Sequence, residues 1–558
     1  MARGLAVSFT VAALAGSVGS DAPWSEPLSA QTPSCVARTA SGDLEGVLRG
    51  GTCVYLGVPY AAPPVAALRW KPPQPRIPWA PAVLNATGTA PACPQINPAG
   101  AMVGVEDCLT LNVWVPANPT TTERPPVLIW LHPGSFLGAS SSLAASDGRR
   151  FAEERGAIVV APNYRLGAFG FLAHPALAME DPNYPSSGNY GLADQRAAIR
   201  WVRQNIEGFG GNPGLVTLAG TSAGAISVSA HLVSPASQGL FQRAIMQSGN
   251  ATARLSTHID GELQGHAFAE ALSCPNGPGV LACLRSKSRD EVLSALPLST
   301  LTGGFQQFTQ EPGRVVWGPI VDGVEIPDQP RDLYRRADFS RVPIIIGTNA
   351  DEGWTFADRS FPTGLDVLGY ERTVRTEFGM DANAVLDLYP VHRFPTPKDA
   401  LARLTSDVEF VCEARRIANA MHHDGAPVFL YSFEYPVDAV SQGRVPHGLE
   451  TNLLFGNNFG APSNHVLTTA DLEIFQAMST YWRRFMENGD PNPRGRPVQW
   501  PSYRPDRSRP EDDQSFNDYY FEFSRNRSIR QFLRDSPCNF WERFYFRSVL
   551  GAVPAAAR

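Results

Sequence analysis

The chain has 558 residues, of which 43% are hydrophobic, 10% aromatic and 18% charged. This balance provides ample apolar material for a core and excludes an intrinsically disordered chain. The formal net charge of −6 gives no electrostatic reason to expect nucleic acid or an anionic membrane surface as a partner.

The first residues predict a secretory signal peptide over residues 1–20. Arg3 precedes an apolar run that ends in small residues, which is the layout of a cleavable signal; a disordered or membrane-anchoring N-terminus is the alternative interpretation. The run is shorter than the ~20 residues that span a bilayer, and no later stretch is long and apolar enough to be a transmembrane helix. We therefore expect an exported protein, extracellular or periplasmic in a Gram-negative host, with one domain over residues 21–558.

The cysteines form an even set of eight, which in an exported protein predicts disulfide bonds. None lies in a close Cys-x-x-Cys pair, so a structural zinc site is not expected. Their positions alone do not select the pairing. The eight are Cys35, Cys53, Cys93, Cys108, Cys274, Cys283, Cys412 and Cys538.

Strand-like and helix-like patterns then follow along the chain. Three short runs predict an antiparallel start to a sheet, namely Cys35–Arg38, Glu45–Leu48 and Thr52–Val58. Later strands are expected at Val127–Leu131, Ala157–Arg165, Leu215–Ala219, Val342–Gly347 and Val428–Tyr435, and helices at Gly191–Phe209 and Leu472–Gly489. The later strands are apolar with little alternation, which indicates burial on both faces of a mainly parallel, helix-covered sheet. The loosely patterned segments Gln306–Trp317 and Pro362–Pro397 are expected to be excursions that cap this sheet.

A candidate nucleophile lies between one strand and the next helical run. The sequence Gly220-Thr221-Ser222-Ala223-Gly224 follows the strand Leu215–Ala219 and precedes the helical run Ala225–Val233. A nucleophile elbow needs this setting, because its tight turn admits only small flanking residues and exposes the serine above the sheet. An ordinary Gly/Ser turn is the alternative.

A nucleophilic serine needs a histidine base and a carboxylate that orients it. The chain has 10 histidines, and sequence spacing does not select one, because such residues meet only in the folded structure. His447 lies in an expected loop after the strand Val428–Tyr435, and Glu352 follows the strand Val342–Gly347. Both positions come after strand ends, where open α/β sheets present reactive groups.

Several longer segments resemble the type-B carboxylesterase and cholinesterase family of α/β-hydrolases. The matching segments include Tyr55–Pro64, Glu106–Pro116, Asn163–Leu172, Phe209–Gly224, Gly318–Gly323 and Asn488–Asn492. The resemblance extends from about Gly42 to Trp541. It implies an α/β-hydrolase fold with a central, mostly parallel sheet flanked by helices. It also implies a carboxylic ester hydrolase with Ser222 as nucleophile, Glu352 as acid and His447 as general base.

The same resemblance implies an oxyanion hole formed by the backbone N–H groups of Gly134, Ser135 and Ala223. Here the family's glycine-rich turn is Pro133-Gly134-Ser135, and Ser135 is a concern because a side chain disfavours positive φ. The resemblance further pairs Cys93 with Cys108, Cys274 with Cys283 and Cys412 with Cys538, which leaves Cys35 with Cys53.

Two departures from the family pattern bear on the substrate. Thr221 stands where many members carry glutamate, and the loop from Cys93 to Cys108 lacks the tryptophan that cholinesterases present to choline. We therefore expect a small-molecule or lipid ester without a quaternary ammonium group, cleaved without metal or organic cofactor. Ser248 and Glu450 also match family positions near the triad, where local packing is an equally good interpretation.

Two other functions remain open. One is a related hydrolase acting on lipids, sterol esters or other acyl compounds through the same residues. The other is a non-catalytic binding protein of the neuroligin type, which loss of Ser222, Glu352 or His447 would have favoured; all three are present. The sequence makes no prediction of the oligomeric state.

Overall fold

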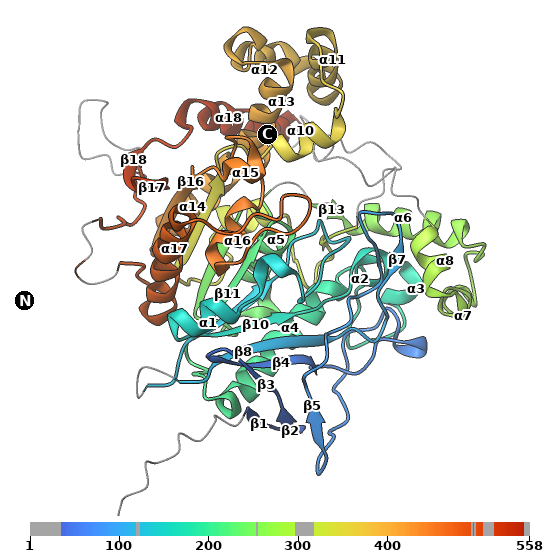
Figure 1. The fold of residues 1–558 in the computed structure, drawn as a ribbon. Helices are drawn as coiled ribbons and strands as arrows, with labels where there is room; N and C mark the ends of the chain where they lie inside the picture. Colours follow the sequence, from blue (N-terminus) through green and yellow to red (C-terminus); the bar gives the residue numbers. More distant parts are fainter. Residues whose placement is uncertain are drawn as a thin grey trace, which may run out of the picture. The chain divides into compact units, whose positions relative to one another are not determined.

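A computed structural model of the chain describes residues 35–118, 123–252, 255–295, 317–492, 495, 498–505 and 518–551. The predicted signal peptide and most of the segment Gln306–Trp317 lie outside these ranges. The described residues form an 11-stranded sheet with helices on both faces (Figure 1). In spatial order its strands are β18 (Ser528–Gln531), β17 (Tyr519–Phe523), β16 (Val428–Phe433), β15 (Ile344–Asn349), β12 (Arg243–Gln247), β11 (Val216–Thr221), β9 (Val127–Leu131), β10 (Ile158–Pro162), β8 (Thr110–Pro116), β4 (Thr52–Pro59) and β3 (Val47–Arg49).

The middle of this sheet is parallel and its two edges are antiparallel. Every neighbouring pair from β10 to β17 is parallel. The pairs β3/β4, β4/β8, β8/β10 and β17/β18 are antiparallel. The expected α/β-hydrolase architecture is therefore confirmed. Because parallel strands share one carboxyl edge, the segments that follow β9, β11 and β15 begin at the same edge of the sheet.

Alternation along the central strands explains why both faces are covered. In β9, Ile129 faces one buried cluster and its neighbours Leu128 and Trp130 face the other. A strand with apolar side chains on both sides cannot leave either face in water. The helices that contribute to the first cluster include α4 (Tyr190–Asn205), α5 (Ala223–Val233) and α14 (Cys412–His423). Those of the second are α1 (Arg149–Arg155), α16 (Leu449–Phe455) and α17 (Thr469–Asn488).

The N-terminal strands differ from the prediction in one respect. The first two, β1 (Val36–Thr39) and β2 (Gly42–Glu45), do pair antiparallel, but with β5 (Val83–Asn85) they form a separate three-stranded sheet. The antiparallel start of the main sheet is instead β3, β4 and β8. The excursion expected at Pro362–Pro397 is largely helical and contains α11 (Val367–Phe378) and α12 (Ala382–Leu388), which lie with α10 (Trp354–Ser360) and α13 (Pro397–Thr405) in Figure 1.

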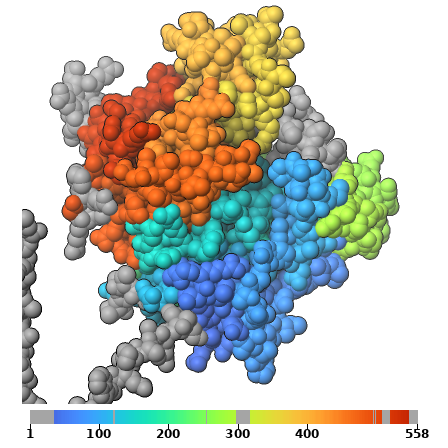
Figure 2. Space-filling model, viewed as in Figure 1, coloured from blue at the N-terminus to red at the C-terminus, as the bar shows by residue number. Residues whose placement is uncertain are grey.

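Segments far apart in sequence meet on the face drawn in Figure 2. There the N-terminal part of the described chain, in blue, lies beside the segment that contains α6 (His258–Ala271), α7 (Val280–Ser286) and α8 (Arg289–Ser294). The Arg69 guanidinium donates to the Lys287 carbonyl over 2.6 Å, and the Arg285 guanidinium pairs with Glu180 at 2.6 Å. These bonds hold α7 and the start of α8 against the body of the fold.

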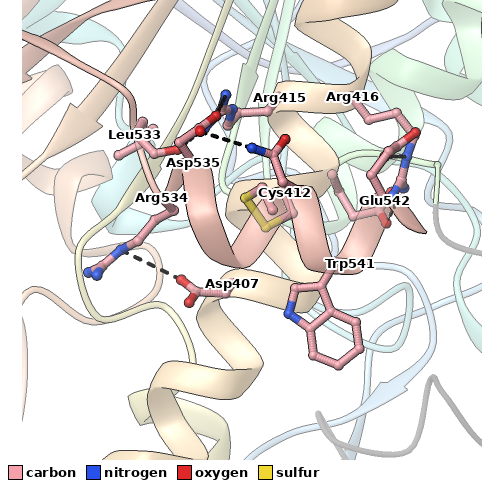
Figure 3. The surroundings of a disulfide bond; sticks show 12 residues. Asp407, Cys412, Arg415, Arg416, Leu533, Arg534, Asp535, Trp541 and Glu542 are labelled. Atoms are coloured by element: carbon pink, nitrogen blue, oxygen red, sulfur yellow. Dashed lines mark hydrogen bonds and ion pairs between the residues drawn. A yellow bond between two sulfur atoms is a disulfide. The ribbon is translucent and has the colours of Figure 1, made fainter. Parts of the chain in front are cut away.

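The last helix of the described chain is tied to the central layers. Figure 3 shows the disulfide from Cys412 of α14 to α18 (Asp535–Gly551), which carries Cys538. Arg415 makes ion pairs with Asp518 at 2.6 Å and with Asp535 at 2.9 Å. The covalent bond and the Arg415–Asp535 ion pair therefore fix α18 against the helix that covers β16.

Candidate active site

Ser222 occupies a sharp turn between β11 and α5. Its φ of 57° and ψ of −123° lie outside the regions that side chains prefer, a strain found mainly at functional sites. A Cβ added to Gly220 would lie 2.5 Å from the backbone of Gly224, and one added to Gly224 would lie 2.0 Å from the Leu131 carbonyl oxygen. The two glycines are therefore required by close backbone contact on both sides of the serine.

Glu352 and His447, which are 95 positions apart, meet at the same sheet edge. Glu352 Oε2 lies 2.6 Å from His447 Nδ1, and the other carboxylate oxygen accepts the Asn349 N–H over 2.7 Å. Glu352 is fully buried and the His447 side chain is only 12% exposed. Their loops are also joined directly, since the Asp351 N–H donates to the Val445 carbonyl over 3.0 Å. The carboxylate therefore holds the imidazole through Nδ1 and leaves Nε2 free.

The free nitrogen of His447 lies in an aromatic environment. Nε2 is buried and has no hydrogen-bond partner among the described residues, Ser222 included. The rings of Phe356 and Phe410 lie 5.2 Å and 5.0 Å from the imidazole. Phe410 belongs to a π-helical turn, Ser406–Val411, a feature frequently found at functional sites. The two rings restrict the imidazole on the sides that Glu352 does not hold.

Two other histidines, His231 and His465, are engaged elsewhere. His231 contacts Ser237 through Nδ1 at 2.9 Å and Gln195 through Nε2 at 3.0 Å, and burial lowers the pKa of this imidazole to about 3. His465 lies 2.9 Å from Asp471, but that carboxylate caps the start of α17. The structure thus distinguishes His447 by the contact of its Nδ1 with a fully buried carboxylate, which sequence spacing could not do.

Glu450 joins the segments that carry the three predicted residues. Its fully buried carboxylate accepts the Thr221 hydroxyl over 3.3 Å and the Gln247 amide over 3.1 Å. The other oxygen accepts the Asn349 amide over 2.6 Å. Burial, reinforced by the charge of Glu352, raises the pKa of Glu450. This one side chain therefore contacts the residue before Ser222 and the strand that leads to Glu352.

The turn after β9 contains two of the predicted oxyanion residues. The φ angles are 118° at Gly134, 54° at Ser135 and 60° at Phe136. Left-handed backbone costs a non-glycine residue about 1–2 kcal/mol, and Ser135 adopts it in spite of its side chain. The third predicted residue, Ala223, begins α5, whose second residue lies against the Leu131 and His132 carbonyls. The start of α5 and the turn are therefore neighbours.

Several residues of the site were not predicted from sequence. Asn349, Phe356 and Phe410 gave no periodic or motif signal, and only the position of Asn349 at a strand end could have suggested it. Gln95 lies in the loop closed by Cys93 and Cys108 and bonds to the segment after the turn. Ser248, which sequence placed near the triad, is buried with φ of 54°, and its hydroxyl has no partner in the described part of the chain.

A cavity of about 40 Å³ adjoins the turn and is lined by Gln95, Leu137 and Trp317 among others, while one of about 330 Å³ on α17 contains none of the predicted site residues. The disulfides are Cys35–Cys53, Cys93–Cys108, Cys274–Cys283 and Cys412–Cys538. Within the described ranges, no group of three or more His, Cys, Asp or Glu residues could hold a metal ion, and no helix is long and apolar enough to cross a membrane.

The fold and this site together define an enzyme of the α/β-hydrolase class. Comparison with known proteins agrees, because the model of the Carboxylesterase family matches residues 33–541. The chain therefore belongs to the carboxylesterase family and is a carboxylic ester hydrolase. It is similar to a fumonisin B1 esterase of Sphingopyxis macrogoltabida, with 35% identity covering 86% of each chain. It is also similar to an acetylcholinesterase of Bungarus fasciatus, with 32% identity over 94% of this chain and 90% of that protein.

Proposed function

We propose that this hydrolase is a secreted serine esterase that uses Ser222, His447 and Glu352 and forms an acyl-enzyme intermediate. The observation that carries the proposal is the 2.6 Å contact between Glu352 Oε2 and His447 Nδ1. It leaves Nε2 as the nitrogen that can accept a proton, at the sheet edge where Ser222 occupies its strained turn. Catalytic hydrogen bonds are often long without substrate, so a free Nε2 is compatible with this role.

The reaction follows from these positions. His447 Nε2 takes the Ser222 proton as the serine attacks the ester carbonyl, and the Glu352 carboxylate fixes the tautomer and stabilises the imidazolium. The N–H groups of Gly134, Ser135 and Ala223 stabilise the negative oxygen of the tetrahedral intermediate. His447 then protonates the leaving alcohol, and a water that it activates releases the acid. No metal or organic cofactor takes part in these steps.

The substrate is proposed to be an ester without a quaternary ammonium group. Cation–π binding of such a group needs an aromatic face, and the loop from Cys93 to Cys108 contains no aromatic residue. Thr221 also puts a neutral hydroxyl, bonded to Glu450, where a carboxylate would attract a cation. These features disfavour a choline ester. They favour an ester of a broader class, of which the substrate in the name of the fumonisin B1 esterase relative is one example.

Export is part of the same proposal. The signal-like residues 1–20 and four disulfides are typical of proteins that fold in an oxidising compartment. Expression in the native host, with detection of the mature chain outside the cytoplasm, tests this part. A chain that stays in the cytoplasm with residues 1–20 attached would contradict it.

Hydrolysis of nitrophenyl esters of increasing acyl length tests the catalytic proposal. Ser222→Ala is expected to lower kcat by about 10⁴–10⁶-fold, since the covalent step is lost. Ser360→Ala, which changes an exposed serine at the end of α10, serves as the control and should keep full activity. A fluorophosphonate probe should label the wild type and not the Ser222 variant. A folded wild type that hydrolyses no ester would contradict the proposal and favour a binding role.

A further inference from the structure

The turn after β9 needs an external restraint. Ser135, Phe136 and Ala139 all have positive φ, at 54°, 60° and 74°, and none of them is a glycine. Backbone in this region persists only where the surroundings over-determine it. The bonds inside the turn, from the Leu137 and Gly138 N–H groups to the Gly134 carbonyl at 2.9 Å and 3.1 Å, do not involve Ala139. Another part of the protein must therefore hold that end.

The Gln95 side chain supplies this restraint. Its Oε1 accepts the Ala139 N–H over 2.9 Å, and its Nε2 donates to the Ala139 carbonyl over 2.9 Å. The second N–H of the amide donates to the Cys93 carbonyl over 3.0 Å. Oxygen thus faces a donor and nitrogen faces two acceptors, so the reversed amide orientation would place like groups together. The glutamine binds both polar groups of one residue of the strained segment.

Gln95 is itself held firmly. It is buried and belongs to β6 (Gln95–Ile96), which pairs with β7 (Met102–Val103). Both strands lie inside the loop closed by the Cys93–Cys108 disulfide. A side chain anchored in a closed hairpin loses little further freedom when it binds, so its two bonds to Ala139 act as a rigid clamp.

A shift of Ala139 would reach the predicted oxyanion residues directly. Gly138, which precedes Ala139, packs tightly against Gly134. A Cβ added to Gly134 would lie 2.2 Å from the Gly138 carbonyl oxygen. Two further amides bind this segment, but at Ser141, where Asn163 accepts the N–H over 2.7 Å and Asn112 donates to the carbonyl over 3.1 Å. Among the described residues, Gln95 is therefore the side-chain amide bound at the position of this segment nearest to Gly134.

We propose that Gln95 is a positioning residue for the oxyanion hole: its clamp on Ala139 keeps the Gly134 and Ser135 N–H groups aimed at the substrate oxygen. This inference rests on the proposed function. In this role Gln95 does not contact the substrate. Its bonds to Ala139 keep the turn in its geometry although Ser135 has a positive φ. The chain can therefore function with serine at that position.

The test compares steady-state kinetics of Gln95→Leu with the wild type. We expect kcat to fall about 10²-fold, as for a lost oxyanion donor, with KM within about threefold. The affinity for a trifluoromethyl ketone, whose adduct carries the oxyanion, should fall by the same factor as kcat/KM. Adding Ser135→Gly should restore at least about tenfold of the loss, because glycine adopts the positive φ without the clamp.

Two further variants keep the test decisive. Gln329→Leu is the matched control, since Gln329 clamps Leu255 with the same pair of backbone bonds, at 3.0 Å and 2.9 Å, and it should leave kcat unchanged. If Gln95→Leu does not fold, Gln95→Met keeps the length of the side chain but not its amide, and its folded fraction should show the same fall in kcat.

The outcomes separate this inference from the proposed function. A wild type without Ser222-dependent turnover would overturn both. An active wild type with normal kcat in the Gln95 variants would overturn only the clamp. A loss in Gln95→Leu that Ser135→Gly does not recover, with the ketone affinity unchanged, would do the same.

Discussion

Replacing Glu352 by glutamine changes one oxygen to an amide and should disable His447 without changing its surroundings. In the wild type one carboxylate oxygen accepts the Asn349 N–H at 2.7 Å and the other contacts His447 Nδ1 at 2.6 Å. Glutamine has a single acceptor oxygen. If that oxygen stays with the Asn349 N–H, the amide NH₂ faces Nδ1 and forces the proton onto Nε2. The imidazole then cannot accept the Ser222 proton.

The size of the effect follows from burial and tautomer together. Glu352 is fully buried, so no water can replace the carboxylate or stabilise the imidazolium in its place. A wrong tautomer in a comparable triad lowers kcat by about 10⁴-fold, which at ~1.36 kcal/mol for each factor of ten is about 5.5 kcal/mol of transition-state stabilisation. The fold should be little affected, because the amide keeps the volume and the bond to Asn349.

Stopped-flow release of nitrophenol measures this effect on the acylation step. Asp351→Asn is the matched control: this neighbouring carboxylate accepts the Val445 N–H at 2.9 Å and pairs with Arg403 at 3.6 Å, contacts that asparagine can partly replace. We expect its rate within about threefold of the wild type, as for other partly exposed pairs. The reasoning is refuted if folded Glu352→Gln keeps more than about a tenth of the wild-type acylation rate, or if both variants lose activity equally.

Two further predictions concern stability. Burial raises the pKa of Asp407 from 3.8 to about 6, so the folded state holds this proton more tightly than the unfolded state. The contribution of Asp407 to the free energy of unfolding should therefore fall by about 3 kcal/mol as the pH rises from 4 through 6. Thermal melts should show that Asp407→Asn flattens the pH dependence over this range, and parallel curves would contradict it. Removing Cys412–Cys538, whose cysteines are 126 positions apart, should lower the free energy of unfolding in urea by about 5 kcal/mol. Removing Cys274–Cys283, whose cysteines are 9 positions apart, should lower it by about 2.5 kcal/mol. Equal losses would contradict the chain-entropy reasoning.

The sequence predicted those parts of the fold that follow from short-range rules. Apolar strands without alternation predicted the parallel centre of the sheet, because burial on both faces requires that pattern. The glycines around Ser222 predicted the turn, because side chains there would collide with backbone. By contrast, the separate sheet of β1, β2 and β5 was missed, since β5 is a three-residue run with mostly exposed side chains and carries no strand signal.

The site could be predicted only in part for a similar reason. Strand ends suggested Glu352 and His447, but resemblance was needed to choose them. Contacts such as Asn349 to Glu450, which are 101 positions apart, depend on how whole layers pack. The π-helical turn that carries Phe410 depends on bonds on both of its sides, including the Gly353 N–H to the Ser406 hydroxyl at 2.8 Å. No local pattern encodes such features.

The bond between Cys412 and Cys538 has a consequence for proteolysis. It encloses His447, all of α16 and α17, and the exposed loop segment Gly460–Pro462. A protease that cuts once in that loop produces two fragments that remain covalently joined. Such a nicked enzyme migrates as one species until it is reduced, because the fragment that carries α17, β17 and β18 stays attached to the fragment that carries Ser222 and His447. The crosslink therefore protects the assembled enzyme from separation after a single cut in this loop.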